Sequence, residues 1–125
     1  MRGARVYAQA DRIWAILTGF VMWSHRRTIT YGELAEKMGY ETRSAGHTLG
    51  RPLELVGRAC LETGLPPLNV IVVTKLGQPG DEVLICPGST VEADQAAVHE
   101  TNWFEWQAPS TGYLRKIWET RNKDS

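Results

Sequence analysis

The segment TITYGELAEKMGYETRSAGHTLGRP, in the first half of the sequence, constrains the fold more than any other part of it. Thr30 and Glu33 have the spacing of a capping box, in which each side chain satisfies a free backbone N–H at a helix start. Ile29 and Leu34, on either side of the cap, have the spacing of a hydrophobic staple. Gly39 is a natural left-handed terminator. The pattern therefore predicts a short helix that starts after Thr30 and stops at Gly39.

A second helix is expected after a short link. Thr42 can cap it, and Arg43 is then its first residue. Pro52 lacks a backbone donor, so we expect it to kink or restart this helix, after which apolar residues continue at helical spacing to Gly64. Residues 28–63 are therefore predicted to form a helix-turn-helix whose second helix consists of two joined pieces.

A β-hairpin is expected next. The run LNVIVVT, Leu68–Thr74, is rich in β-branched residues and indicates a strand buried on both faces. KLGQPGD then has the composition of a turn, and EVLIC, Glu82–Cys86, is expected to be the returning strand. A hairpin at residues 68–86, directly after a helix-turn-helix, is the wing of a winged helix.

A core helix is expected in the N-terminal segment, residues 1–27. Asp11 is expected to cap this helix, and its apolar residues form a stripe that Trp23 widens. The C-terminal elements, residues 89–121, start with Ser89 at a second capping-box spacing and end with an amphipathic helix, and they are expected to pack over the first helix and the hairpin.

One domain covering residues 1–125 is therefore predicted. Its class is α+β, mostly helical: a winged helix-turn-helix with a β-hairpin wing and extra C-terminal helices. The composition, 42% apolar and 22% charged, is that of a globular protein. The longest mostly apolar window, Ile13–Trp23, is too short to span a bilayer, and the N-terminus lacks the pattern of a cleavable signal, so we expect no membrane association and a cytoplasmic location.

Charge is distributed unevenly although the net charge is zero. Residues 1–60 hold nine Lys/Arg and five Asp/Glu, whereas residues 61–125 hold five and nine. A polyanion should therefore meet the first half of the chain. Cys60 and Cys86 have no metal-ligand spacing, and His47 has no partner ligand near it in the sequence, so no metal and no cofactor is expected.

The stretch TITYGELAEKMG followed by RSAGHTLG resembles the DNA-binding domain of the alkylguanine DNA alkyltransferases and the alkyltransferase-like proteins. The similarity is strong over about 25 residues and loose over the hairpin. It implies a DNA-repair protein whose recognition helix enters the minor groove of duplex DNA. It also implies that Tyr31 presses on the phosphate beside the target nucleotide and that Arg43 fills the space of a flipped-out base.

The reactive centre of that family is absent. The family carries a Pro-Cys-His-Arg segment on the strand after the recognition helix, whereas here that strand reads VIVVTK, Val70–Lys75. A thiolate activated by a neighbouring imidazole cannot be built from these residues. Cys86 lacks an adjacent histidine or cation, which favours a buried structural thiol over a nucleophile. We therefore expect a non-enzymatic DNA-binding protein with no catalytic residue.

Candidate DNA contacts lie on the predicted recognition helix, before the motif and on the wing. Each has a simpler alternative. Tyr31 can cover the edge of the core, and Arg43 can be solvated or pair with Glu41. Arg26 and Arg27 can be present because a helix C-terminus is stabilised by positive charge. The remaining polar residues can simply face solvent. The candidates are Tyr31, Arg43, Ser44, Gly46, His47, Thr48, Gly50, Arg51, Arg26, Arg27, Lys75 and Gln78.

An aromatic cluster in the acidic half raises a second hypothesis. Trp103, Phe104 and Trp106 are expected either to pack in the core or, if exposed, to contact a protein partner. In that alternative the winged-helix frame serves as a protein-protein interaction module, for example a regulator or inhibitor of a nuclease or defence system.

Overall fold

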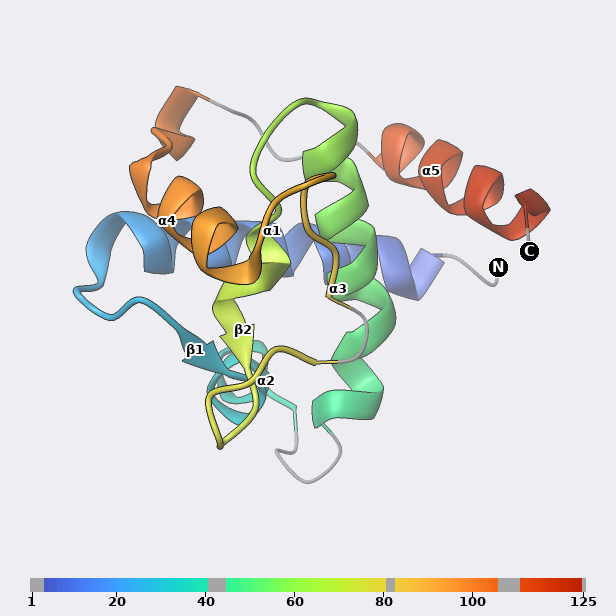
Figure 1. The fold of residues 1–125 in the computed structure, drawn as a ribbon. Helices are drawn as coiled ribbons and strands as arrows, with labels where there is room; N and C mark the ends of the chain where they lie inside the picture. The colour runs from blue at the N-terminus through green and yellow to red at the C-terminus, as the bar shows by residue number, and fades with distance from the viewer. Residues whose placement is uncertain (1–3, 41–44, 81–82, 106–110, 125) are drawn as a thin grey trace.

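The computed structural model describes residues 4–40, 45–80, 83–105 and 111–124. Within these residues the fold is mostly helical and contains a small parallel sheet (Figure 1), so the α+β, mostly helical class is confirmed. In chain order the elements are α1 (Ala4–Trp23), β1 (Ile29–Thr30), α2 (Tyr31–Met38), α3 (Ala45–Glu62), the 3-10 helix η2 (Leu68–Ile71), β2 (Val72–Val73), α4 (Val91–Glu100), the 3-10 helix η3 (Trp103–Glu105) and α5 (Thr111–Asp124).

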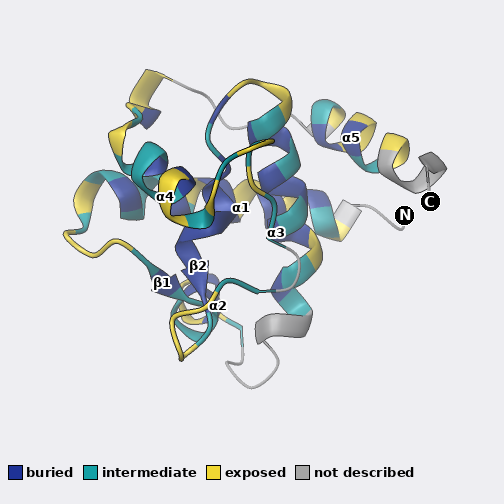
Figure 2. Ribbon diagram, viewed as in Figure 1, coloured by how far each residue is buried: buried dark blue, intermediate teal, exposed yellow. Residues whose placement is uncertain are grey.

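The core is centred where α1 crosses α3. These two helices contact each other, and α5 packs against both of them, while α4 packs against α1 and η2 (Figure 1). Ile13 and Leu17 of α1 and Leu53 of α3 are fully buried. Burial of each such side chain contributes roughly 1.5–3 kcal/mol relative to exposure. Figure 2 shows the buried residues gathered where α1, α3 and β2 meet.

Two predictions about the helices are wrong, the cap at Asp11 and a restart at Pro52. Asp11 does not cap α1, because the helix already begins at Ala4, and Tyr7 and Ala10 extend its buried face by a further two turns. Pro52 does not divide the second helix, since α3 continues through it to Glu62. Proline removes only one backbone donor. Burial of the residues around it, Leu49 and Leu53, holds the helix together across that gap.

The predicted hairpin also differs from the structure. Leu68–Thr74 is buried up to Val73 as expected, but its first half is the 3-10 helix η2, and β2 pairs in parallel with β1. Residues 83–86 form no strand, and among the residues that the structure describes the only β-type pairing across the turn is a single bridge between Val73 and Pro79. Pro79 has no N–H to donate, so it removes one hydrogen bond from any ladder at this position. The described residues therefore contain a turn in place of the predicted hairpin.

The C-terminal elements differ by one residue at their start. Thr90, not Ser89, caps α4, because the Thr90 hydroxyl accepts from the Ala93 N–H at 3.1 Å. Ser89 instead donates its hydroxyl to the buried carboxylate of Asp94 at 2.7 Å. The Cys86 N–H donates to the same carboxylate at 2.8 Å, which ties this coil to α4. Across the described ranges, no helix combines the length and apolarity needed to cross a bilayer.

Gly57 of α3 sets how closely η2 packs on α3. A Cβ atom at Gly57 would lie 2.6 Å from Oδ1 and 2.8 Å from Cγ of Asn69. Asn69 is buried, and its amide has no hydrogen-bond partner among the residues described. A glycine at position 57 is therefore what allows the Asn69 side chain to fit between the two elements.

Gly57→Ala is expected to lower the free energy of unfolding by about 1 kcal/mol, because an overpacking cost of roughly 1–3 kcal/mol exceeds the helix propensity gained, about 1 kcal/mol. Urea denaturation measures this difference. In an Asn69→Ala background the same substitution should no longer destabilise. Strictly additive effects of the two substitutions would show that the Gly57–Asn69 contact is not the cause.

Candidate nucleic-acid interface

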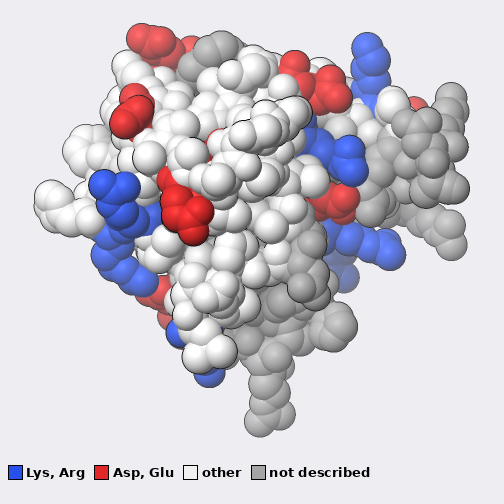
Figure 3. Space-filling view, viewed as in Figure 1, with Lys and Arg blue, Asp and Glu red and all other residues white. Residues whose placement is uncertain are grey.

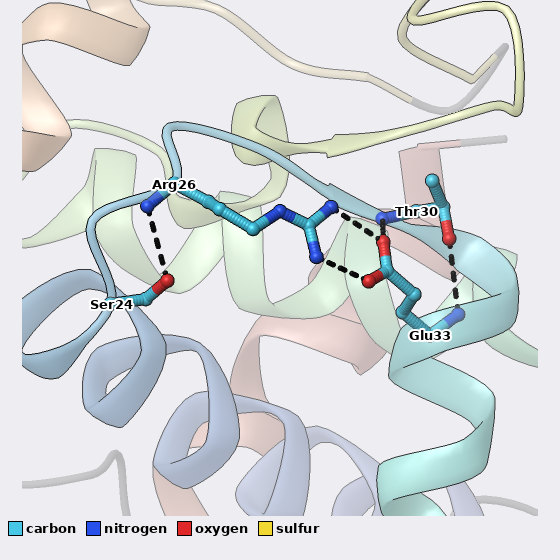
Figure 4. A network of polar contacts seen from close by, with 4 residues as sticks. All are labelled: Ser24, Arg26, Thr30 and Glu33. Carbon is cyan, nitrogen blue, oxygen red and sulfur yellow. Dashed lines mark hydrogen bonds and ion pairs between the residues drawn. The ribbon is translucent and has the colours of Figure 1, made fainter.

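The junction between β1 and α2 is fixed by the predicted capping box. The Thr30 hydroxyl accepts from the Glu33 N–H at 3.1 Å, and the Thr30 N–H donates to Oε1 of Glu33 at 3.0 Å (Figure 4). Thr30 also pairs with Val73 in the sheet. The capping box is thus confirmed. Its consequence is that Tyr31 is the first residue of α2 and has a defined position at the end of the strand.

Arg26 completes this junction. Its guanidinium donates to both carboxylate oxygens of Glu33, with Nη2 2.8 Å from Oε1, and its backbone N–H donates to the Ser24 hydroxyl at 3.1 Å (Figure 4). The hydrogen bond from Arg26, with help from the Thr30 N–H, lowers the pKa of Glu33 from 4.5 to about 2. Arg26 therefore connects the segment after α1 to the start of α2, and its guanidinium is already occupied by a carboxylate.

The C-terminal end of α2 is also held by hydrogen bonds. Gly39 adopts the left-handed conformation with φ of 80°, and its N–H donates to the Glu36 carbonyl at 3.0 Å, as the sequence predicts. Arg12 of α1 donates from Nη2 to the carbonyl of Met38 at 2.8 Å, which satisfies one of the free carbonyls at the helix end. The Gln9 amide also donates to the Tyr40 hydroxyl at 3.2 Å. No local sequence pattern predicts these two contacts from α1.

The first turns of α3 carry the predicted recognition surface. Thr48 and Gly50 are half-buried and Arg51 is exposed, whereas Leu49 between them is fully buried in the core. Gly46 and His47 belong to the helix, and the structure does not describe their side chains. Arg43 and Ser44 lie outside the described residues. Thr48 and Arg51 are therefore on the accessible side of α3.

The turn after β2 lies at the same end of the molecule as α2 and the start of α3, the lower end in Figure 1. The Thr74 N–H donates to the Gln78 carbonyl at 2.7 Å, and Gly77 has a φ of 82° that favours glycine. Lys75 and Gln78 are both exposed, as is Leu76. The predicted wing residues thus occupy a closed, protruding turn.

Two further candidates flank the junction. Tyr31 is half-buried and packs against the core, and it therefore partly fills the simpler role of covering the core edge. The Arg27 side chain is exposed, and its backbone carbonyl lies 2.8 Å from Nε2 of His99 in α4. That contact fixes the backbone of Arg27 while leaving its charge in solvent.

Neither cysteine has the environment of a nucleophile. Burial raises the pKa of the Cys60 thiol from 9.0 to about 12. Cys86 is half-buried, less than expected, and burial together with the neighbouring Asp94 carboxylate raises the pKa of its thiol as well. Both thiols are therefore protonated at neutral pH, whereas an attacking cysteine needs a lowered pKa. No group of His, Cys, Asp or Glu in the described part of the chain is arranged to hold a metal ion.

Figure 3 shows Lys and Arg side chains near the left and right edges of the visible face, with Asp and Glu side chains close to both groups and uncharged residues over most of the centre. No protein-family model matches the sequence, and comparisons with curated proteins and with solved structures found no similar protein. The resemblance to the alkyltransferases therefore rests on the residues quoted above.

Acid should weaken the junction through Glu33. The folded pKa of Glu33, about 2, lies below its ordinary value of 4.5, so its ionised form stabilises the fold above about pH 4.5 and loses this effect as the pH falls towards 2. Glu33→Gln should therefore be less stable than the natural chain at pH 7, with the difference shrinking below pH 4.5. Urea denaturation at pH 7, 4 and 2.5 measures it.

Glu36→Gln is the matched control, because Glu36 is an exposed carboxylate on the same helix that makes no ion pair with any described residue. It should leave the acid dependence unchanged. An equal acid dependence for both variants would mean that the Arg26–Glu33 pair does not stabilise the junction.

Proposed function

We propose that this chain is a non-enzymatic DNA-binding protein of the alkyltransferase-like winged-helix type, which binds duplex DNA in the minor groove. The binding surface consists of the start of α2, the first turns of α3 and the turn Thr74–Pro79, which serves as a short wing. The observation that carries the proposal is the common location of these three segments at one end of the molecule (Figure 1), together with the exposure of Arg51, Lys75 and Gln78.

The anchoring of α2 supports this proposal. A recognition surface must keep its shape when it meets DNA, because ordering it on binding costs affinity. The Thr30 cap and the Arg12 contact hold both ends of α2, and α2 contacts α3 and both strands. Tyr31, at the start of α2, is thereby held beside the proposed phosphate path.

Charge supplies the affinity in this proposal. The first 60 residues hold the excess of Lys and Arg, and phosphate contacts dominate DNA binding. Arg27, Arg43, Arg51 and Lys75 are the cations that we assign to phosphate or base contacts. We assign Arg26 a positioning role, because Glu33 already occupies its guanidinium. The protonated thiols of Cys60 and Cys86 fit binding without alkyl transfer.

Fluorescence anisotropy with a labelled duplex oligonucleotide at two salt concentrations tests the proposal. Affinity should fall steeply with salt, and Arg43→Ala and Lys75→Ala should each weaken binding and reduce the slope of log K against log salt by about 1. Lys116→Ala, which removes an exposed cation from α5, is the matched control and should change neither quantity. Parallel titrations with mismatched and alkylated duplexes measure lesion preference.

The proposal fails if the chain does not bind duplex DNA at low salt. It also fails if Lys116→Ala weakens binding as much as Arg43→Ala and Lys75→Ala do, because binding would then reflect overall charge and not a defined surface.

A further inference from the structure

Two adjoining apolar hollows lie on the outer side of the C-terminal half of α1. The first, about 630 Å³, lies between α1 and α2 and includes Ile16, Phe20 and Lys37. The second, about 300 Å³, lies between α1 and η3. Both hollows share Ala15, Gly19 and Trp23, so they form one continuous surface, which we call the α1 groove.

The floor of the α1 groove is open because of Gly19. A Cβ atom placed on Gly19 would meet no other atom within 4 Å. Ala15, Gly19 and Trp23 follow each other at intervals of four residues, so they lie along one side of α1. Small residues at two of these positions allow another helix to approach α1 closely. The shape of the groove therefore suits a helix lying along or across α1.

Two large aromatic side chains stand exposed at one end of the α1 groove. Trp23 is 78% exposed and Phe104 is 69% exposed, and their rings meet edge to face with centroids 6.1 Å apart. Trp14 and Trp103 lie buried beside them, with their ring centroids 5.5 Å apart. The Trp103 indole N–H donates to the Val98 carbonyl at 2.9 Å. An exposed aromatic pair on a rigid base is typical of protein interfaces, where tryptophan is enriched among the residues that dominate affinity.

The charge beside the α1 groove is positive. Glu33 and Arg26 both line the first hollow and neutralise each other. Lys37 lines the same hollow and makes no ion pair with a described residue. The second hollow has no charged residue in its lining. The side of the groove facing α2 is therefore complementary to an acidic partner.

We propose that the α1 groove binds an amphipathic helix of a partner protein, with apolar side chains in both hollows and an Asp or Glu residue facing Lys37. Helices bind grooves of this kind through apolar anchors at positions i, i+3 or i+4, and i+7. This interaction is separate from the proposed DNA binding, because it uses the outer face of α1 and the exposed aromatic pair.

A display library of helical peptides selected on the full chain tests this inference. The enriched peptides should carry apolar residues at helical spacing with acidic residues beside them. Trp23→Ala and Gly19→Leu should each weaken their binding at least about tenfold. Lys37→Gln should weaken it about two- to fivefold, as expected for an exposed ion pair. Lys116→Leu, a new apolar side chain on α5, is the matched control and should have no effect.

Gly19→Leu separates binding from folding. A Cβ atom at position 19 meets no other atom within 4 Å, and leucine is a better helix former than glycine, so the melting temperature should not fall while the groove is filled. Duplex DNA binding should also be unchanged in this variant, so the peptide result stands or falls independently of the DNA result.

Four results would overturn the inference: no enriched peptides, enriched peptides that are basic, enriched peptides unaffected by Gly19→Leu, or another occupant. A concentration-dependent dimer in sedimentation that Trp23→Ala abolishes would make a second copy of this chain the occupant. Binding of a single-stranded oligothymidine that Trp23→Ala abolishes would make the exposed aromatic pair a base-stacking surface instead.

Discussion

One threonine joins three parts of this fold. Thr30 is the last residue of β1, pairs with Val73 of β2 and caps α2 through its hydroxyl. Its partner in the capping box, Glu33, also accepts from Arg26 in the segment after α1. Strand, helix and preceding segment therefore meet at one set of hydrogen bonds. The direction of α2, and with it the proposed DNA-facing end, depends on this junction.

The parallel pairing of β1 with β2 extends this constraint to the rest of the unit. Parallel strands cannot be joined by a tight turn, because the chain must return to the starting end of the first strand. Here α2, α3 and η2 make that return. The close contact of Gly57 with Asn69 then lets η2 pack directly on α3 before β2 begins. The short pairing of β1 with β2 thus brings together the two ends of a segment that contains α2 and α3.

Local signals in the sequence predicted the parts of the fold that depend on neighbouring residues. The capping box at Thr30 and the terminator at Gly39 are confirmed because each involves residues only a few positions apart. The expected strand Glu82–Cys86 is absent in its described part for the opposite reason, since β2 pairs with the distant strand β1 and has a single bridge, at Pro79, on its other side. Pro52 likewise stays helical because distant core contacts outweigh one lost donor.

The candidate site residues show the same difference between local patterns, which the sequence reveals, and contacts between distant elements, which it does not. Arg26 is a candidate phosphate contact from its position before the helix-turn-helix, and the structure adds that its guanidinium donates to Glu33, seven residues later. Trp23 was predicted to widen the core face of α1, and it lies mostly in solvent against Phe104 because α1 ends there. Arg12 supports the end of α2 from another helix without any local pattern. Contacts between elements are not visible in sequence spacing.

Nuclear magnetic resonance with a duplex oligonucleotide tests the central claim most directly, because backbone amide shifts map the contact surface residue by residue. The account predicts the largest shifts at the start of α2, in the first turns of α3 and in the turn Thr74–Pro79, with α5 and η3 unchanged. Shifts centred on α5, or spread evenly over the surface, would contradict the claim that the end organised by Thr30 is the one that meets DNA.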